Sequence, residues 1–223
     1  MSNKSDNHDT GLLREIDEEL RQEHYSNLWS RYGNYLIAAA ILLVVGVASY
    51  KGWQSYEMSQ RVDAGARFSA AVSLAEQGNM DQAFEAFSEI SKDAPDGYRV
   101  LAQFRSAGVL SSKGDVSAAA MAYEEISSDS SIQKEYRDLA TLLEITNMLD
   151  QGSPESLKAK LAPLTVADSP WRFSALELSA ILALRNGNRQ SAIDTLTQLS
   201  SDMATPTGIR TRTDEMLAAL NAQ

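Results

Sequence analysis

The sequence of 223 residues has no cysteine, only two histidines, and few glycines and prolines, twelve and five. The absence of cysteine excludes disulfides, thiolate nucleophiles and cysteine-based zinc sites. The formal net charge of −10 argues against a nucleic acid partner, because phosphate binding needs clustered lysine and arginine. The scarcity of glycine and proline beside abundant alanine and leucine favours helices.

One long apolar run stands out against this background. Between Arg31 and Lys51 lie 19 uncharged residues, YGNYLIAAAILLVVGVASY. As a helix this run is about 28 Å long, close to the roughly 30 Å of a bilayer core. We predict a transmembrane helix over 32–53. Its anchor residues are Tyr35, Leu36, Ile37, Ile41, Leu42, Leu43, Val44, Val45, Val47, Tyr50 and Trp53.

Two alternatives exist for this run, a buried helix of a soluble core and a cleaved signal peptide. A signal peptide has a short basic leader, whereas here 31 residues with seven acids and four bases precede the run, so an uncleaved anchor fits better. The charges do not orient the anchor, because three arginines on the amino side face three basic residues close on the other side.

The segment before the apolar run divides in two. Residues 1–10 are polar and predict a disordered tail. Residues 11–31 place Leu12, Leu13, Ile16 and Leu20 at helical spacing opposite a charged face, which predicts an amphipathic juxtamembrane helix.

Four copies of one pattern follow the apolar run. Their glycines, Gly78, Gly114, Gly152 and Gly187, are 36, 38 and 35 residues apart. The residues 5, 9 and 12 positions after each glycine are Ala83, Phe87 and Ile90; Ala119, Tyr123 and Ile126; Leu157, Leu161 and Leu164; and Ala192, Leu196 and Leu199. The residues 16 and 12 positions before each glycine are Val62 and Ala66; Tyr98 and Ala102; Tyr136 and Ala140; and Trp171 and Ala175. Such spacing predicts one buried face on each of two helices.

Each copy therefore predicts a helix A before the glycine, a tight turn at the glycine, and a helix B after it. Stacked helix pairs form a solenoid, so residues 54–223 are predicted to be one all-α repeat domain. A last helix from Ile209 to about Leu220 would cover its open end.

We searched the chain for catalytic, cofactor and metal sites and expect none of them. Ser131 and Lys134 fit a Ser-x-x-Lys motif, but three matching positions arise easily by chance and the companion motifs are missing. The carboxylate pairs Glu124-Glu125 and Asp214-Glu215 are neighbours on helix surfaces. The chain has no glycine-rich phosphate loop and no HExxH motif. We therefore predict a protein that is not an enzyme and takes no small-molecule substrate.

An arginine follows the first position of three helices A and of the last helix: Arg99, Arg137, Arg172 and Arg210. We favour a structural role, in which each guanidinium binds a loop of the preceding repeat, over a row of donors that captures carboxylates. A candidate peptide groove combines three of these arginines with polar residues of helix A. The groove residues are Arg99, Gln103, Ser106, Arg137, Glu144, Asn147, Arg172, Glu177 and Ser179.

The repeat pattern resembles the tetratricopeptide repeat. The whole chain from residue 11 resembles a bacterial family of single-span membrane proteins with a tetratricopeptide-like domain, which includes the ancillary subunit of the Sec translocon. The resemblance rests on IDEEL at 16–20, LWSRYGNYLIAAA at 28–40, YKGWQSY at 50–56, AGARF at 64–68 and the aromatic–Arg pairs at 98–99, 136–137 and 171–172. Leu157 in an alanine position and a long polar amino-terminal arm depart from it.

The resemblance implies an inner-membrane protein with a cytoplasmic amino terminus and a periplasmic repeat domain. It implies translocon subunits, periplasmic chaperones and exported polypeptides as partners. The hypothesis is a chaperone-like accessory factor of protein export, and the alternative is a static adaptor of another envelope complex, such as division or wall machinery. From residue 52 on, 15 Lys and Arg against 23 Asp and Glu give −8, which attracts basic partner segments.

Overall fold

The computed structural model describes residues 6–222, with side chains from residue 29 onward. Within this range the chain forms α-helices, one 3-10 helix and no strand, which confirms the predicted all-α class. The elements are α1 (Asp6–Glu76), α2 (Met80–Asp93), α3 (Asp96–Ser112), α4 (Val116–Ser128), α5 (Lys134–Met148), α6 (Pro154–Leu161), η1 (Ala162–Leu164), α7 (Arg172–Arg185), α8 (Arg189–Ser201) and α9 (Thr207–Asn221).

The chain divides into two compact units, Met1–Ser59 and Gln60–Gln223. Helix α1 begins in the first unit at Asp6, inside the segment predicted as a disordered tail. Residues 1–5 of that tail lie outside the described residues. The predicted amphipathic segment 11–31 is helical, but its side chains as far as residue 28 also lie outside the description.

The apolar run of the first unit is a helix whose side chains are exposed. Its most apolar stretch has a mean hydropathy of 1.8 and is only 6% buried, so length and composition suit a membrane span. Leu42 and Leu43 are 72% and 67% exposed. A helix inside a soluble core would bury such residues. The helix does not fit the alternative of a buried core helix.

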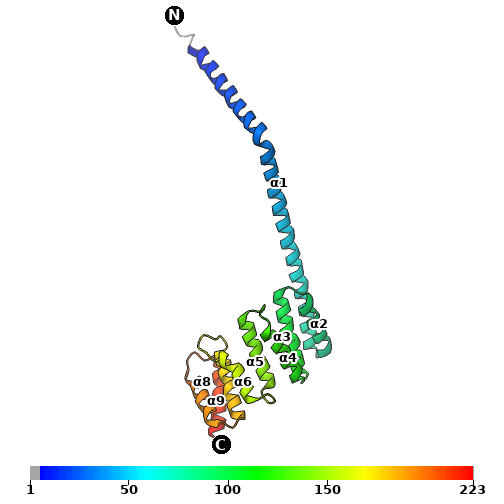
Figure 1. The fold of residues 1–223 in the computed structure, drawn as a ribbon, viewed down its shortest axis with the longest axis vertical. Helices are drawn as coiled ribbons and strands as arrows, with labels where there is room; N and C mark the ends of the chain where they lie inside the picture. Colours follow the sequence, from blue (N-terminus) through cyan, green and yellow to red (C-terminus); the bar gives the residue numbers. More distant parts are fainter. Residues whose placement is uncertain (1–5, 223) are drawn as a thin grey trace. The chain divides into compact units, whose positions relative to one another are not determined.

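The second unit is a series of paired helices in chain order. Helix α3 pairs with α4, α5 with α6, and α7 with α8, and α9 packs on α8. At the end of α1, Phe68 and Ala71 pack with Phe87 of α2. Figure 1 shows α2 to α9 following one another in the order of the colours, from cyan-green to red. This arrangement confirms the predicted solenoid of helix pairs.

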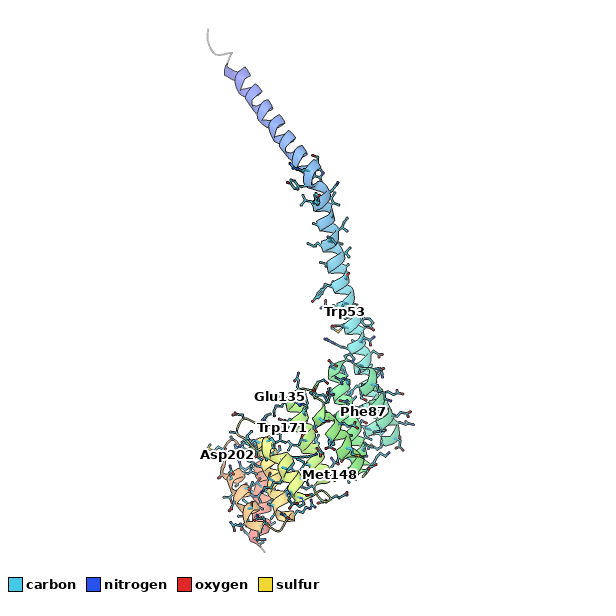
Figure 2. All side chains as sticks on the ribbon, viewed as in Figure 1. Trp53, Phe87, Glu135, Met148, Trp171 and Asp202 are labelled. Carbon is cyan, nitrogen blue, oxygen red and sulfur yellow. The ribbon has the colours of Figure 1, made fainter. Side chains whose placement is uncertain are left out.

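All twelve residues predicted for the buried face of helix B are buried, each at most 5% exposed. Phe87, labelled in Figure 2, is 1% exposed. It packs in a cluster with Ala71 of α1 and Ala102 of α3. One helix B thus contacts its own helix A and the next one. Two further clusters, around Tyr123 and around Leu161, repeat this arrangement.

The predicted alanines of helix A are buried in three of four cases. Ala102, Ala140 and Ala175 are fully buried because each packs on the helix B of the preceding repeat. Ala66 is exposed, and Val62 on the same face is 65% exposed. The prediction was wrong for the first repeat because no helix B precedes it in the unit.

A second buried row on helix A was missed. The residues seven positions before the glycines, Ala71, Ala107, Ile145 and Ala180, are all fully buried. The first three pack in a core cluster with their own helix B. The sequence did contain the signal, since small or apolar residues recur there at a constant offset.

Three of the four turn glycines adopt the left-handed conformation that we predicted, with φ of 81° at Gly78, 84° at Gly114 and 74° at Gly187. Gly152 does not. A Cβ at Gly152 would lie 3.0 Å from the carbonyl oxygen of Met148 and 3.1 Å from Leu157, so the turn leaves little space for a side chain there.

The third repeat has a short helix B. Ser153 caps α6 by accepting from the Ser156 amide, and Pro154 occupies its first turn. The helix ends at Leu161, and Leu164 reaches the core from η1, which contains Pro163. A proline at this point removes a helical hydrogen bond and favours the end of an α-helix.

Candidate functional site

Two of the recurring arginines, Arg99 and Arg172, lie next to aspartates. The Arg99 guanidinium lies 3.1 Å from Asp96 and 3.9 Å from Asp129, and that of Arg172 lies 3.5 Å from Asp202. Asp129 and Asp202 lie in the loop that closes the same repeat, whereas we expected the preceding repeat. These contacts support the structural role of the arginines over ligand capture.

The other two recurring arginines differ from this pattern. Arg210 donates to the carbonyl oxygens of Asp202, Met203 and Thr205, at 3.2, 3.0 and 2.9 Å, in the loop of the preceding repeat, as we expected. The Nε of Arg137 is buried without a hydrogen-bond partner among the described residues.

The first repeat has an equivalent ion pair from a different arginine. Arg67 of α1 donates two hydrogen bonds of 3.0 Å to the carboxylate of Asp93, in the last turn of α2. These bonds hold the pKa of Asp93 below its ordinary value. Asp93, Asp129 and Asp202 each stand 15 residues after a turn glycine, so the sequence contained a signal for these pairs that we missed.

Trp171 begins the fourth repeat and bonds back to the third. Its indole nitrogen donates to the carbonyl oxygen of Glu135, at 2.9 Å, and the two residues are neighbours in Figure 2. The ring also packs against the core cluster of α5, α6 and α7. The aromatic residue thus holds two adjacent helices A together.

The nine residues of the candidate groove do not form one polar network. No hydrogen bond or ion pair joins any two of these nine side chains in the described structure. Ser106 lies 3.4 Å from Ser88 of α2, and Asn147 and Ser179 bond carbonyls of their own helices. Gln103 is half-buried, and its Oε1 has no partner among the described residues. Their role as a peptide groove stays a prediction.

Glu144, one of the nine, is part of a bridge across three helices. It is 6% exposed, and its carboxylate accepts from the ammonium of Lys160 on α6, which also lies 3.1 Å from Glu124 on α4. Burial alone would lower the pKa of Lys160, but its hydrogen bonds to Glu144 and Glu124 raise the pKa above its ordinary value. The bridge thus spans the space over α5, between α4 and α6, which we call the groove over α5.

Glu177 makes a similar contact at the end of the array. It is 8% exposed and accepts two hydrogen bonds from Arg212 of α9, at 2.6 and 2.7 Å. These bonds raise the pKa of Arg212. Glu177 therefore fixes the last helix to α7 instead of facing a partner freely.

One repeat beyond the bridge at Glu144, the corresponding space over α7 is open. A cavity of about 310 Å³ opens between α6 with η1 on one side, α7 at its base and α8 on the other side. Of the nine predicted groove residues, Ser179 alone lines it. Its lining includes apolar, hydroxyl and amide side chains and one lysine, Lys158.

The residues of the Ser-x-x-Lys motif do not form a nucleophilic pair. The Ser131 hydroxyl donates to Asp129, at 2.7 Å, and the Lys134 ammonium donates to Asp138, at 2.5 Å. The carboxylate pairs bind elsewhere too, since Glu124 contacts Lys160 and Asp214 accepts from Ser200. In the described part of the chain, these groups stabilise turns and helices.

These features define a class of protein: a helical-repeat domain that is preceded by a helix apolar and long enough to act as a single-pass membrane anchor. The family model of the tetratricopeptide repeat-like domain matches residues 26–204. The chain belongs to that family. A search of curated proteins finds no match.

The limits of the match agree with the structure. It begins before the apolar run and ends before α9, so the family pattern includes the candidate anchor and all four helix pairs. Domains of this family typically bind proteins and are not catalytic, which gives the chain a protein-interaction role.

Proposed function

We propose that this protein is a membrane-anchored, protein-binding accessory factor of protein export, with a chaperone-like role beside the Sec machinery. The anchor is the transmembrane helix 32–53. The repeat domain, residues 54–223, binds translocon subunits, periplasmic chaperones and exported polypeptides. The carrying observation is the combination of an exposed apolar helix with a solenoid of the tetratricopeptide repeat-like family in one chain.

The exposure of the apolar run supports the anchor. Tyr35 and Tyr50 near its two ends are 74% and 68% exposed, and Trp53 is 66% exposed. Aromatic rings with a polar atom prefer the interface between lipid and water. The side chains between them have no protein to bury them within the unit, and lipid tails would cover them.

The proposed topology places the amino terminus in the cytoplasm and the repeat domain in the periplasm of a bacterial inner membrane. It comes from the resemblance to the export family, since the charges beside the anchor do not orient it. Tethering confines the repeat domain to the membrane surface and so raises its effective concentration for partners that lie there.

A static adaptor is the second candidate. The buried cross-repeat bridges at Glu144 and Glu177 favour a stiff array, and a stiff array suits a permanent complex such as division or wall machinery. The two candidates differ in the number of partners. An accessory of export meets many unrelated chains, whereas an adaptor holds one stoichiometric partner.

Photo-crosslinking in native membranes separates the candidates. A photoreactive residue replaces Leu101 of α3 or Met121 of α4, which are 47% and 59% exposed and outside the core. The export role predicts adducts with translocon subunits and with many exported chains, and these adducts should fall when export is blocked. One dominant adduct that is unaffected by the block would support the adaptor instead.

A protease-protection experiment tests the topology. Protease added outside cells with a permeable outer membrane should digest the repeat domain and leave a membrane fragment that contains the amino terminus. Digestion only after the inner membrane is opened would reverse the orientation and remove the export role.

A further inference from the structure

Where a helix A lies between two helices B, three sequence positions, one on each helix, are equivalent from repeat to repeat. The first is ten residues after the glycine of one helix B. The second is eight residues before the glycine of the next helix A, and the third is eight residues after that glycine. Over α5 these positions hold Glu124, Glu144 and Lys160, which form the ionic bridge.

Over α3 the polar contact between the helices is simpler. Its three positions hold Ser88, Ser106 and Ala122, and the two hydroxyl oxygens lie 3.4 Å apart. A polar contact between two or more helices therefore lies over helix A in both repeats.

The groove over α7 lacks such a contact. Its three positions hold Ala162, Ser179 and Thr195. The hydroxyls of Ser179 and Thr195 donate to carbonyls of their own helices, Ala175 at 2.7 Å and Ser191 at 2.9 Å. All three residues line the cavity of about 310 Å³. The cavity thus occupies the place where the neighbouring repeat has its ionic bridge.

The lining of the cavity defines a ligand chemistry. Leu176 and Leu182 supply apolar surface, Asn186 supplies an amide, and the exposed Lys158 supplies a positive charge. No acidic residue lines the cavity, although the chain from residue 52 on carries −8. Lys158 has no ion-pair partner among the described residues. An apolar side chain next to a carboxylate complements these groups.

We propose that this cavity is a peptide-binding pocket, which takes an apolar side chain and an adjacent carboxylate from a partner protein. The carboxylate is that of an Asp or Glu side chain or of a chain terminus. The volume is near the lower end of ligand pockets, about 300 to 1,000 Å³, and suits one such group of atoms. The inference rests on the proposed protein-binding function and names the chemistry of one partner segment.

The experiment fills the pocket with the three side chains that form the ionic bridge over α5. The variant Ala162→Glu/Ser179→Glu/Thr195→Lys rebuilds the bridge of Glu124, Glu144 and Lys160 over α7. Fluorescein-labelled peptides in a Gly-Ser background are titrated into the full chain in detergent micelles. One peptide has an internal Leu-Glu and an amidated end, and a second ends in leucine with a free carboxylate. Their controls carry glutamine or an amidated leucine.

The wild-type chain should bind at least one carboxylate peptide roughly two- to fivefold more tightly than its amide control, and the closed variant should lose this preference. Lys158→Ala should weaken binding roughly two- to fivefold, because an exposed ion pair contributes little, and Lys92→Ala on α2 should change nothing. If circular dichroism shows that the closed variant is unfolded, the Lys158→Ala variant tests the pocket in its place.

Equal affinity for carboxylate and amide peptides, or unchanged binding by the folded closed variant, would overturn the pocket. So would the absence of binding at about 1 mM peptide. The broader function has its own readout. If the peptide assay fails while crosslinks from Leu101 or Met121 to partners are found, the protein-binding role stands and this site alone is wrong.

Discussion

Lys160 connects three helices through two carboxylates, and one of these, Glu144, is almost completely buried. Replacing Lys160 with methionine keeps the length of the side chain but leaves the Glu144 carboxylate without its cation. A buried charge without a partner is costly. Since the Lys160 side chain is 34% exposed, we expect a loss of about 1 to 3 kcal/mol in the free energy of unfolding. Urea unfolding of the full chain in detergent, followed by circular dichroism, measures it.

The double variant Glu144→Leu/Lys160→Met tests the cause. It removes the uncompensated charge, so it should be more stable than Lys160→Met alone. Lys92→Met, on an exposed position of α2, serves as the control and should leave stability unchanged. A double variant less stable than the single one would contradict the burial argument.

The Arg67–Asp93 pair predicts a dependence of stability on acid. Because its folded-state pKa lies below the value in the unfolded chain, Asp93 stabilises the fold above about pH 4. This contribution disappears as the pH falls through the lowered pKa. Asp93→Asn should therefore be less stable than wild type at roughly pH 6, and the difference should shrink as the pH falls below about 4. Urea unfolding across this range measures the difference.

Arg67→Met is the matching control, because it removes the same hydrogen bonds from the other side. It should reproduce the effect at neutral pH and likewise converge with wild type in acid. A constant difference between Asp93→Asn and wild type at every pH would mean that the ionised carboxylate is not the stabilising group.

The buried face of each helix could be predicted from apolar residues that recur at constant offsets, whereas the contacts between polar side chains could not. Ala83, Phe87 and Ile90 recur in type and offset, because apolar burial needs only a face of the right period. The bridge of Glu124, Glu144 and Lys160 occurs once among the three grooves, so no repeat signals it. Three acids do recur 15 residues after glycines, and this weaker signal was missed.

At the scale of elements, the turn between α3 and α4 depends on Gly114, whose φ is 84°. An alanine there is forced into the left-handed region, so Gly114→Ala should lower the free energy of unfolding by about 1 kcal/mol. Gly97 lies exposed in the first turn of α3, and a Cβ there meets nothing within 4 Å. Gly97→Ala should instead stabilise by about 0.5 to 1 kcal/mol.

Thermal unfolding of the two alanine variants gives the comparison directly. The melting temperature should fall for Gly114→Ala and rise for Gly97→Ala, each by a few degrees. Shifts of the same sign would show that the backbone conformation of Gly114 does not decide the outcome.

Elements were predicted well where the repeat is regular and poorly where it is not. The four helix pairs and the last helix all form, but α6 ends after eight residues and the cavity lies beside it. Pro163, which favours the early end of α6, could be read from the sequence. Whether the groove over a helix A is open depends on side chains from three different helices. The periodicity of one helix does not predict how these side chains combine.

For the whole molecule, membrane attachment is the property to test first. Leu42→Arg/Val45→Arg places two charges in the apolar run, at a cost of about 6 kcal/mol for insertion. We expect this variant to leave the membrane pellet on extraction with alkaline carbonate, whereas wild type stays. Ser59→Arg/Gln60→Arg, with the same added charge beyond the run, should behave as wild type. If the first variant remained in the pellet, another part of the chain would hold the membrane.

The core clusters also determine the order in which the repeats can complete their folding. Each cluster contains the helix B of one repeat and an alanine of the next helix A: Ala102 for the first, Ala140 for the second and Ala175 for the third. During synthesis or passage through a membrane, a repeat therefore stays incomplete until its successor arrives. The fourth waits for Ile209 and Thr213 of α9. A chain stopped at residue 204, where the family match ends, would still display the apolar side of α8 to whatever quality-control protease surrounds it.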